Sequence, residues 1–180
     1  MREREHTVAA VVAAAPGRRL TSRVRLQKAV YLLDQLGLKS GFTFEYHYYG
    51  PYSRNLDNAT TDASALKLIE ESIDYRYSDG ASYSVFAAPE GVSPKDQAYG
   101  KLGRPRTSEL VALFSRTNVT VLELAATIHW LSRYEKARDW RSEVVRRKGA
   151  KVGEGRLQSA IELLRSLGLL PAEQHAAGLV

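Results

Sequence analysis

The residues best suited to chemistry lie between positions 44 and 53, which read FEYHYYGPYS. Four of these ten residues are tyrosine, one is His47, and Gly50-Pro51 marks a turn. Tyrosine combines a large apolar ring with a polar hydroxyl, and histidine is the side chain most often used as a general base. The segment therefore fits a catalytic pocket, a metal site, a nucleic-acid stacking surface, a protein-binding face or a tightly packed corner of the core.

The rest of the sequence gives catalysis and metal binding little support. The chain has no cysteine, which removes disulfides, thiolate metal sites and cysteine nucleophiles. Its four histidines, at positions 6, 47, 129 and 175, lack the i, i+3 or i, i+4 spacing of a helical metal site. No nucleophile or glycine-rich phosphate loop accompanies His47. We predict a non-enzymatic protein with no catalytic residue, no metal and no cofactor, and a core or boundary position for His129.

The net charge of +6 is unevenly distributed along the 180 residues. Residues 1–25 carry +4, residues 26–100 carry −4 and residues 133–156 carry +5. Two basic segments around an acidic middle suit an acidic partner, either nucleic acid or an acidic protein. A solvated basic face without any partner is the alternative interpretation.

No segment approaches the roughly 18 uninterrupted apolar residues of a membrane span. The stretch TVAAVVAAAP at 7–16 follows two arginines, but Glu3 and Glu5 dilute that positive start, so a first helix is a better interpretation than a signal peptide. We expect a cytoplasmic protein that binds no membrane.

Periodicity and capping predict the elements that must position these residues. A helix begins at a Thr21 or Ser22 cap and ends at Gly37. Phe44, Tyr46 and Tyr48 alternate with other residues in a short extended segment, which Pro51 prevents from being a central strand. Other helices are predicted over 7–15, 54–69, 107–117, 120–135, 138–149 and 155–167, a hairpin over 72–88 turning at Asp79-Gly80, and a loop over 89–106.

Two of these helices carry further expectations. Thr120 and Glu123 match a capping box, in which each side chain bonds the other's free backbone amide. In the 54–69 helix, an apolar stripe that includes Leu66 and Ile69 should face the core.

The element order predicts a mainly α fold, a helical bundle with a small β-hairpin and a winged-helix-like N-terminal half. We expect a single domain over 1–170, in which 7–88 is the winged-helix-like half and 107–170 the helical half. Residues 171–180 are expected to be a flexible tail.

Four segments resemble a known family: RLQKAVYLLDQLG at 25–37, YHYYGPYSRNLD at 46–57, the hairpin, and LELAATIHWL at 122–131. Together they resemble the YwgA-like family of small bacterial proteins, which is similar to the Panacea (DUF4065) antitoxin domain and to the C-terminal, toxin-binding domain of DNA ADP-ribosyl glycohydrolase antitoxins. The residues that match the family's helix and turn are Leu26, Gln27, Lys28, Tyr31, Tyr49, Gly50, Pro51 and Tyr52.

The resemblance implies a non-enzymatic protein-binding role, often as the antitoxin of a bacterial toxin–antitoxin or phage-defence locus. Some relatives are thought to act as acidic mimics of DNA. With a net charge of +6 this chain departs from that pattern, and only residues 26–100 have the required sign.

We therefore expect the tyrosine segment to be half core corner and half interface. Tyr46 and Tyr48 share a face with Phe44 and should be buried, whereas Tyr49 and the edge of Tyr52 should stay accessible near Lys28. The predicted partner-binding residues are Arg25, Lys28, Tyr49 and Tyr52.

A winged-helix nucleic-acid-binding regulator is the alternative function. It would use the two basic segments, in particular Arg18, Arg19, Arg23, Arg146, Arg147 and Lys148.

Overall fold

Seven α-helices and two small antiparallel sheets make up the computed structural model in the part of the chain it describes, residues 3–172. Their order is α1 (Arg4–Ala14), β1 (Arg19–Thr21), α2 (Arg23–Leu36), β2 (Glu45–His47), β3 (Gly50–Tyr52), α3 (Arg54–Ala65), β4 (Glu70–Tyr75), β5 (Ser82–Ala87), α4 (Gly103–Arg116), α5 (Val119–Arg133), α6 (Trp140–Lys148) and α7 (Arg156–Ser166). Single 3-10 turns follow α1, precede α4 and follow α6: η1 (Pro16–Arg18), η2 (Asp96–Tyr99) and η3 (Gly149–Val152). A mainly α fold with small antiparallel β-structure is thereby confirmed. The expected flexible tail lies outside the described residues, apart from Pro171 and Ala172.

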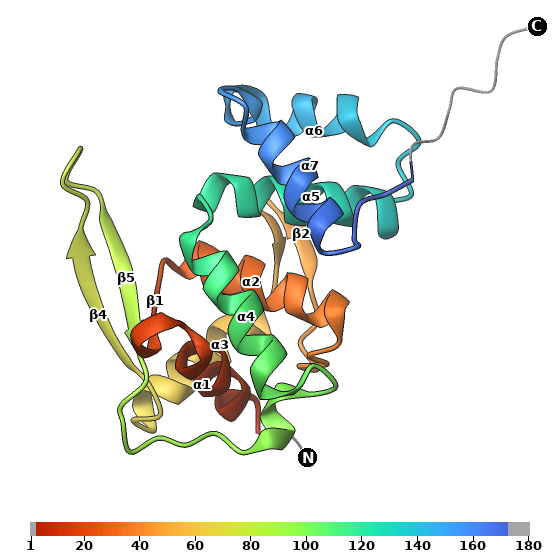
Figure 1. The fold of residues 1–180 in the computed structure, drawn as a ribbon. Helices are drawn as coiled ribbons and strands as arrows, with labels where there is room; N and C mark the ends of the chain where they lie inside the picture. Colours follow the sequence, from red (N-terminus) through yellow and green to blue (C-terminus); the bar gives the residue numbers. More distant parts are fainter. Residues whose placement is uncertain (1–2, 173–180) are drawn as a thin grey trace, which may run out of the picture.

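The predicted hairpin of β4 and β5 is part of a three-stranded sheet in the order β1-β5-β4. Strand β1 was not predicted; it has three residues, and its pairing of Leu20 with Phe86 links the segment before α2 to β5. Figure 1 shows the hairpin projecting to one side of the helices, while α5, α6 and α7 lie together at the other end of the molecule. Strand β4, at the edge of this sheet, is therefore exposed to solvent along most of its length.

One continuous apolar core joins the two halves of the chain, from Val8 in α1 to Leu167 after α7. Helix α5 is its central element, because ten of its residues are buried and it packs against α2, α6 and α7. Burial of this apolar surface is the main force that holds the helices together. The tyrosine segment, which forms β2 and β3, packs against both α2 and α5.

Serine caps fix the starts of α2 and α3 as predicted. The Ser22 and Ser53 side chains accept hydrogen bonds from the backbone amides of Arg25 and Leu56. Gly37 ends α2 in the left-handed conformation, with φ of +116°.

The predicted capping box of α5 is wrong. Asn118, two residues earlier than Thr120, accepts from the amides of Thr120 and Val121 and begins the helix. Glu123 is instead buried, where it bonds to two lysines. A carboxylate paired with lysines has no need of the backbone amide that a capping box would offer it.

Three helix boundaries differ from the prediction by three residues or more. Helix α3 ends at Ala65 because Lys67 takes a left-handed φ of +57°, which buries Ile69 and leaves Leu66 59% exposed. Helix α1 begins already at Arg4. Helix α4 begins at Gly103, inside the predicted loop, with Pro105 in its first turn, where a missing amide proton costs nothing.

Among residues 3–172, no single helix is long and apolar enough to cross a lipid bilayer. Helices α4 and α5 reach the necessary length and composition only as a pair, and they are bent by 118° relative to each other.

Candidate functional site

The tyrosine segment forms a β-hairpin of its own. Strands β2 and β3 pair antiparallel with Tyr46 opposite Pro51 and His47 opposite Gly50, so that Tyr48 and Tyr49 form the turn. Pro51 does not lie in a central strand, as predicted, since β3 pairs only with β2 in a two-stranded sheet. Gly50 has φ of +83°, and a Cβ at this position would lie 2.6 Å from Thr127 Oγ1 on α5. The hairpin therefore needs a glycine here in order to pack closely on α5.

Two side chains of α2 hold the backbone of this hairpin. Gln27 accepts from Ser53 N and donates to Ser53 O, both at 2.9 Å. Lys28 Nζ donates to Pro51 O at 2.5 Å. Consecutive residues of α2 thus satisfy backbone groups at the end of the hairpin, which gives a physical reason for the occurrence of LQK and GPYS in one sequence.

Lys28 is not the accessible cation that the sequence analysis expected. Its side chain is only 1% exposed, so it does not present a charge beside Tyr49 at the surface. Burial lowers the pKa of Lys28 to about 7; Glu123 acts in the opposite direction, and the positive charges of Lys148 and Lys151 add to the lowering. Lys28 is therefore a buried support of the hairpin and does not contact a partner in this conformation.

A second buried lysine holds the turn from the other side. Lys148, at the end of α6, is 7% exposed and donates to Tyr48 O at 2.9 Å and to Glu123 Oε1 at 2.8 Å. Lys151 adds two bonds to the same carboxylate, at 2.9 and 3.0 Å. Burial lowers the pKa of Lys148, although the bond to Glu123 opposes this shift. The predicted role of Lys148 in contacting nucleic acid does not fit its buried position.

The two turn tyrosines lie outside this support, in contact with solvent. Tyr48 is 79% exposed, contrary to the expected burial, because residues at a hairpin turn leave the alternation of the strand. Tyr49 is 50% exposed, as expected for an accessible residue. Their rings meet edge to face with centroids 5.0 Å apart, and Lys151 Nζ lies 5.4 and 4.7 Å from the two centroids. Two rings and a cation thus share one small surface.

Tyr46 extends this surface towards the end of α5. Its ring, which was expected to be buried, is only half-buried under the guanidinium of Arg147, whose Cζ lies 4.7 Å from the ring centroid. Arg147 also donates two hydrogen bonds to Glu135, at 2.9 and 2.6 Å, and hydrogen bonding to Glu135 is the largest reason that the pKa of Arg147 is raised. The same carboxylate accepts from Trp130 Nε1 at 3.2 Å.

We refer to this connected surface as the aromatic band; its members are Tyr46, Tyr48, Tyr49, Trp130, Tyr134, Arg147 and Lys151. Trp130 and Tyr134, at the end of α5, have ring centroids 4.7 Å apart, and Tyr134 is 52% exposed. Trp130, Tyr134 and Lys151 were not predicted as site residues. The sequence WLSRY does place Trp130 and Tyr134 on one helix face, but only the fold links that face to Tyr46 of β2, through Glu135 and Arg147.

The other predicted partner-binding residues have structural contacts. The Arg25 guanidinium donates to the carbonyl oxygens of Phe114 and Thr117, at the end of α4. Tyr52 is half-buried and lies 4.9 Å from the His47 ring. Neither residue belongs to the aromatic band, and their part in partner binding stays a prediction.

The basic residues assigned to nucleic acid are not gathered on one face. Arg18 donates to the carbonyl oxygens of Ala88, Pro89 and Val92, and Arg23 bonds to Asp57 and Glu71. Arg146 and Arg147 both bond to Glu143. Arg19 is exposed, on β1.

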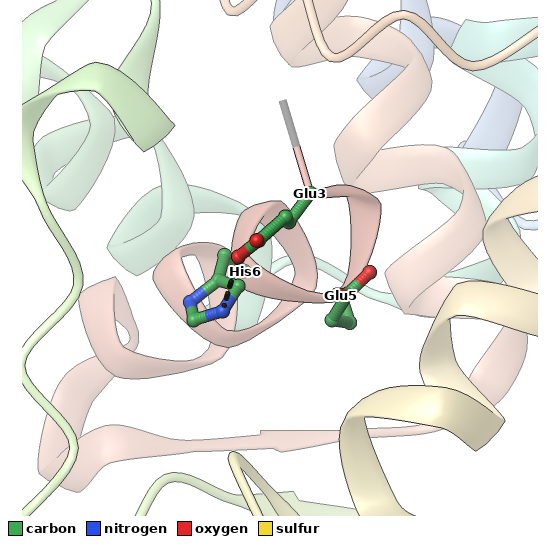
Figure 2. Close-up of side chains that lie close together, drawn as sticks. All are labelled: Glu3, Glu5 and His6. Carbon is green, nitrogen blue, oxygen red and sulfur yellow. Dashed lines mark ion pairs between the residues drawn. The ribbon is translucent and has the colours of Figure 1, made fainter. Parts of the chain in front are cut away.

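Three ligand-type side chains lie close together at the start of α1. Glu3, Glu5 and His6 have potential ligand atoms within 4.8 Å of one another, and Figure 2 shows Glu3 pointing to His6. His6 Nε2 lies 2.8 Å from Glu3 Oε2, and both side chains are about half exposed or more. Exposed acidic groups close to one another are common in proteins without a metal ion, so we assign no site to this cluster.

His129 has the buried position that was predicted. It is 7% exposed, and its Nδ1 lies 2.8 Å from the hydroxyl oxygen of Tyr31. Burial lowers the pKa of His129 to about 4, with the positive charge of Arg133 adding to the effect, so the ring is neutral at physiological pH. Its contact with Tyr31 joins α5 to α2.

The chain matches no protein-family model and no curated protein sequence.

Proposed function

We propose that this chain is a cytoplasmic, non-enzymatic protein-binding module that uses the aromatic band to contact its partner. The observation that carries the proposal is the contrast at the hairpin turn. The side chains of Tyr48 and Tyr49 are exposed, but the backbone of the hairpin is held in place. Lys148 donates a hydrogen bond to Tyr48 O, and Lys28 donates one to Pro51 O. Exposed rings on a fixed backbone lose little conformational entropy when a partner covers them.

The composition of the band agrees with that of protein interfaces. Tyrosine, tryptophan and arginine are the residue types that most often dominate binding energy at an interface. The band contains four tyrosines, Trp130 and Arg147, and Lys151 adds a cation to the turn. Its cations favour a partner with acidic groups among its own apolar residues.

An antitoxin, or a regulator of a toxin–antitoxin or phage-defence locus, is the class of module that we favour. The support is the resemblance of the LQK and YGPYS segments to the YwgA-like family, together with their direct contact here. Gln27 and Lys28 bond to the backbone at Pro51 and Ser53, so the two segments act as one unit.

The N-terminal half is proposed to be winged-helix-like. The order α1, β1, α2, α3, β4, β5 with the sheet order β1-β5-β4 supports this assignment, and β2 with β3 is an insertion between α2 and α3. In such a module α3 and the β4–β5 hairpin would face DNA. Residues 54–87 carry three basic and six acidic residues, a charge that opposes phosphate contacts.

The experiment for the proposed function uses the genes that flank this one. Each neighbouring product is co-expressed with the full chain, and complex formation and growth are measured. The proposal expects one neighbour to form a stable complex and, if it is toxic alone, to lose its toxicity. It fails if Tyr49→Ala, in a protein that melts like the wild type, leaves that complex as tight as before.

A salt titration with labelled duplex and single-stranded DNA tests the alternative function. Phosphate contacts release counterions, so true binding weakens steeply as salt rises. Our proposal expects no such binding. Tight, salt-sensitive binding that is lost when Arg19 is changed to Glu would favour the nucleic-acid regulator instead.

A further inference from the structure

Strand β4 has an outer edge that pairs with no other strand of residues 3–172. It is the last strand of the sheet β1-β5-β4 and pairs only with β5. Figure 1 shows β4 as the outermost strand of this sheet, on the projecting hairpin. The free edge of a strand presents backbone N–H and C=O groups that can pair with a further strand.

The pairing of β5 shows which residues of β4 point to this free edge. Ser84 O accepts from Ser22 N on the β1 side of β5. Because the backbone groups of a strand alternate between its two neighbours, Val85 bonds to its partner Ser72 on the β4 side. The next residue of β4, Ile73, therefore directs its N–H and C=O to the free edge, and so do the residues two positions before and after it.

The side chains along this edge combine apolar groups with charges. Ile73 is 56% exposed and Tyr75 is 66% exposed. Glu71 already bonds to Arg23 and to the Ser84 hydroxyl, so its charge is compensated within the chain. Burial of exposed apolar side chains is the main gain that a second strand on this edge would bring.

The charges of β4 complement those of an antiparallel second copy in one register. When Ile73 lies opposite Ile73 of the second copy, Glu70 lies opposite Arg76 of the second copy, just after the end of its strand. Ser72 then lies opposite Asp74, so that a hydroxyl faces a carboxylate. Opposite charges and donor–acceptor pairs directly across two strands stabilise the pairing.

The neighbouring registers place acids opposite acids. A shift towards the start of β4 brings Glu70 opposite Asp74 or, one step further, Glu71 opposite Glu71. A shift in the other direction brings Asp74 opposite Asp74. Like charges directly opposite each other destabilise a strand pair, so these registers are disfavoured.

Two contacts within the chain must adjust when the copies pair. Asp74 Oδ1 accepts from Tyr75 N at 2.8 Å, and this amide must donate to the second copy instead. Arg76 forms an exposed ion pair with Asp79, which is inexpensive to share with another carboxylate. These adjustments and the short length of β4 limit the strength of the association.

We propose that two copies of this chain associate through the outer edges of β4, with Ile73 opposite Ile73, and so join their two three-stranded sheets into one. The surface lies on the projecting hairpin, while the aromatic band involves α5 and α6 at the other end of the molecule (Figure 1). Both aromatic bands stay free in the dimer. The proposal is therefore independent of the proposed function, and failure of one leaves the other standing.

Sedimentation velocity of the full chain over a range of concentrations measures the association. A contact of this small area should give a dissociation constant of about 0.1 mM. Ile73→Lys should weaken it about tenfold or more, because it opposes two ammonium groups. Tyr77→Lys adds the same charge in the turn, past the paired residues, and should have little effect. A chain that stays monomeric up to about 1 mM, or equal effects of both variants, overturns the proposal.

Single cysteines test the register. The chain has no cysteine, so a single introduced one forms disulfides only between copies. The Cα atoms at position 73 should lie about 5.5 Å apart, within disulfide range, whereas those at position 75 should lie about 14 Å apart. Under mild oxidation Ile73→Cys should therefore form the crosslinked dimer at least about tenfold faster than Tyr75→Cys. Equal rates, or faster crosslinking of Tyr75→Cys, would contradict the register.

A charge exchange tests the pair formed by Glu70 and Arg76 of the second copy. Glu70→Arg and Arg76→Glu should each weaken the dimer by about threefold or more, and the double variant should restore most of the loss. In one extended strand the two positions are about 20 Å apart, so the restoration must come from contact between copies. A double variant that dimerises no better than the single variants would show that these residues do not face each other.

Discussion

Gln27 and Ser53 form a reciprocal pair of hydrogen bonds across 26 positions of sequence, with both distances 2.9 Å. The amide of Gln27 satisfies the backbone N–H and C=O of Ser53, and the Ser53 hydroxyl in turn begins α3. Gln27 and Ser53 are 6% and 0% exposed. One buried side chain thus connects α2, the hairpin and the start of α3, and so fixes the position of the exposed tyrosines.

Gln27→Ala should therefore destabilise the protein strongly. The buried N–H of Ser53 loses its partner, while the Ser53 C=O keeps only the bond from Asp57 N, and this costs about 1–3 kcal/mol of the free energy of unfolding. Gln35→Ala, two turns further along the same helix and at the surface of α2, should cost less than about 0.5 kcal/mol. Urea unfolding of both variants checks the difference, and equal stabilities would show that the contact with Ser53 contributes little.

Gly50→Ala should lower the free energy of unfolding by more than the strain of a left-handed alanine alone. An alanine at this position would combine unfavourable φ with a Cβ 2.6 Å from Thr127 Oγ1, so we expect a loss of about 2–4 kcal/mol. Gly80→Ala has a similar φ but open space around its Cβ, and should lose only about 1 kcal/mol. Thermal melting of the two variants measures the difference, and a Gly50 variant as stable as the Gly80 variant would contradict the close packing of the hairpin on α5.

The Glu123→Gln variant should be much less stable than a variant that loses a surface ion pair. The substitution leaves the buried ammonium of Lys148 without a full counter-charge, which costs about 3–5 kcal/mol. Glu109→Gln, which removes an exposed partner of Arg106, should leave the melting temperature nearly unchanged. If both variants melt alike, Glu123 is not a buried counter-ion.

The low pKa of Lys28 predicts a specific dependence of stability on pH. Its pKa is about 7 in the folded protein, against an ordinary value of 10.5, so between these values the unfolded chain holds more protons. The free energy of unfolding must therefore rise with pH in this window, by up to about 1.4 kcal/mol per pH unit. Below pH 7 the cost of burying the charged amine is fully present.

The comparison of wild type with Lys28→Met isolates this contribution. The difference in unfolding free energy should shift by about 2 kcal/mol in favour of the wild type between pH 7.5 and 9.5. Denaturant unfolding at several pH values measures it. A difference that stays constant with pH means that Lys28 keeps its ordinary pKa in the folded protein.

Local signals in the sequence predicted the helices well. Ser22, Ser53 and Gly37 act through groups a few residues away, so their roles in capping α2 and α3 are visible without the fold. Asn118 was missed because Thr120 and Glu123 offered a second, equally local pattern. Only the approach of α6 shows that Glu123 pairs with Lys148.

The candidate site was predicted only in part, because it depends on contacts between distant segments. The turn predicted that Tyr49 would be accessible. The composition of the tyrosine segment indicated that this segment is a candidate site. The exposure of Tyr48 depends on a two-residue turn, and the burial of Lys28 on the hairpin that covers it. No period or spacing in the sequence indicates that Trp130 would be linked to that hairpin through Glu135 and Arg147.

Photo-crosslinking from the hairpin turn tests the central claim most directly. A photoreactive phenylalanine analogue is placed at Tyr49 or, as the control, at Tyr77, which is fully exposed on the turn between β4 and β5. The full chain is then irradiated in its own host, and any adduct is identified by mass spectrometry. The account predicts one defined protein adduct from position 49, weakened by Tyr48→Ala, and none from position 77. No adduct at position 49, or the same adduct from both positions, would contradict the claim that the aromatic band is the binding surface.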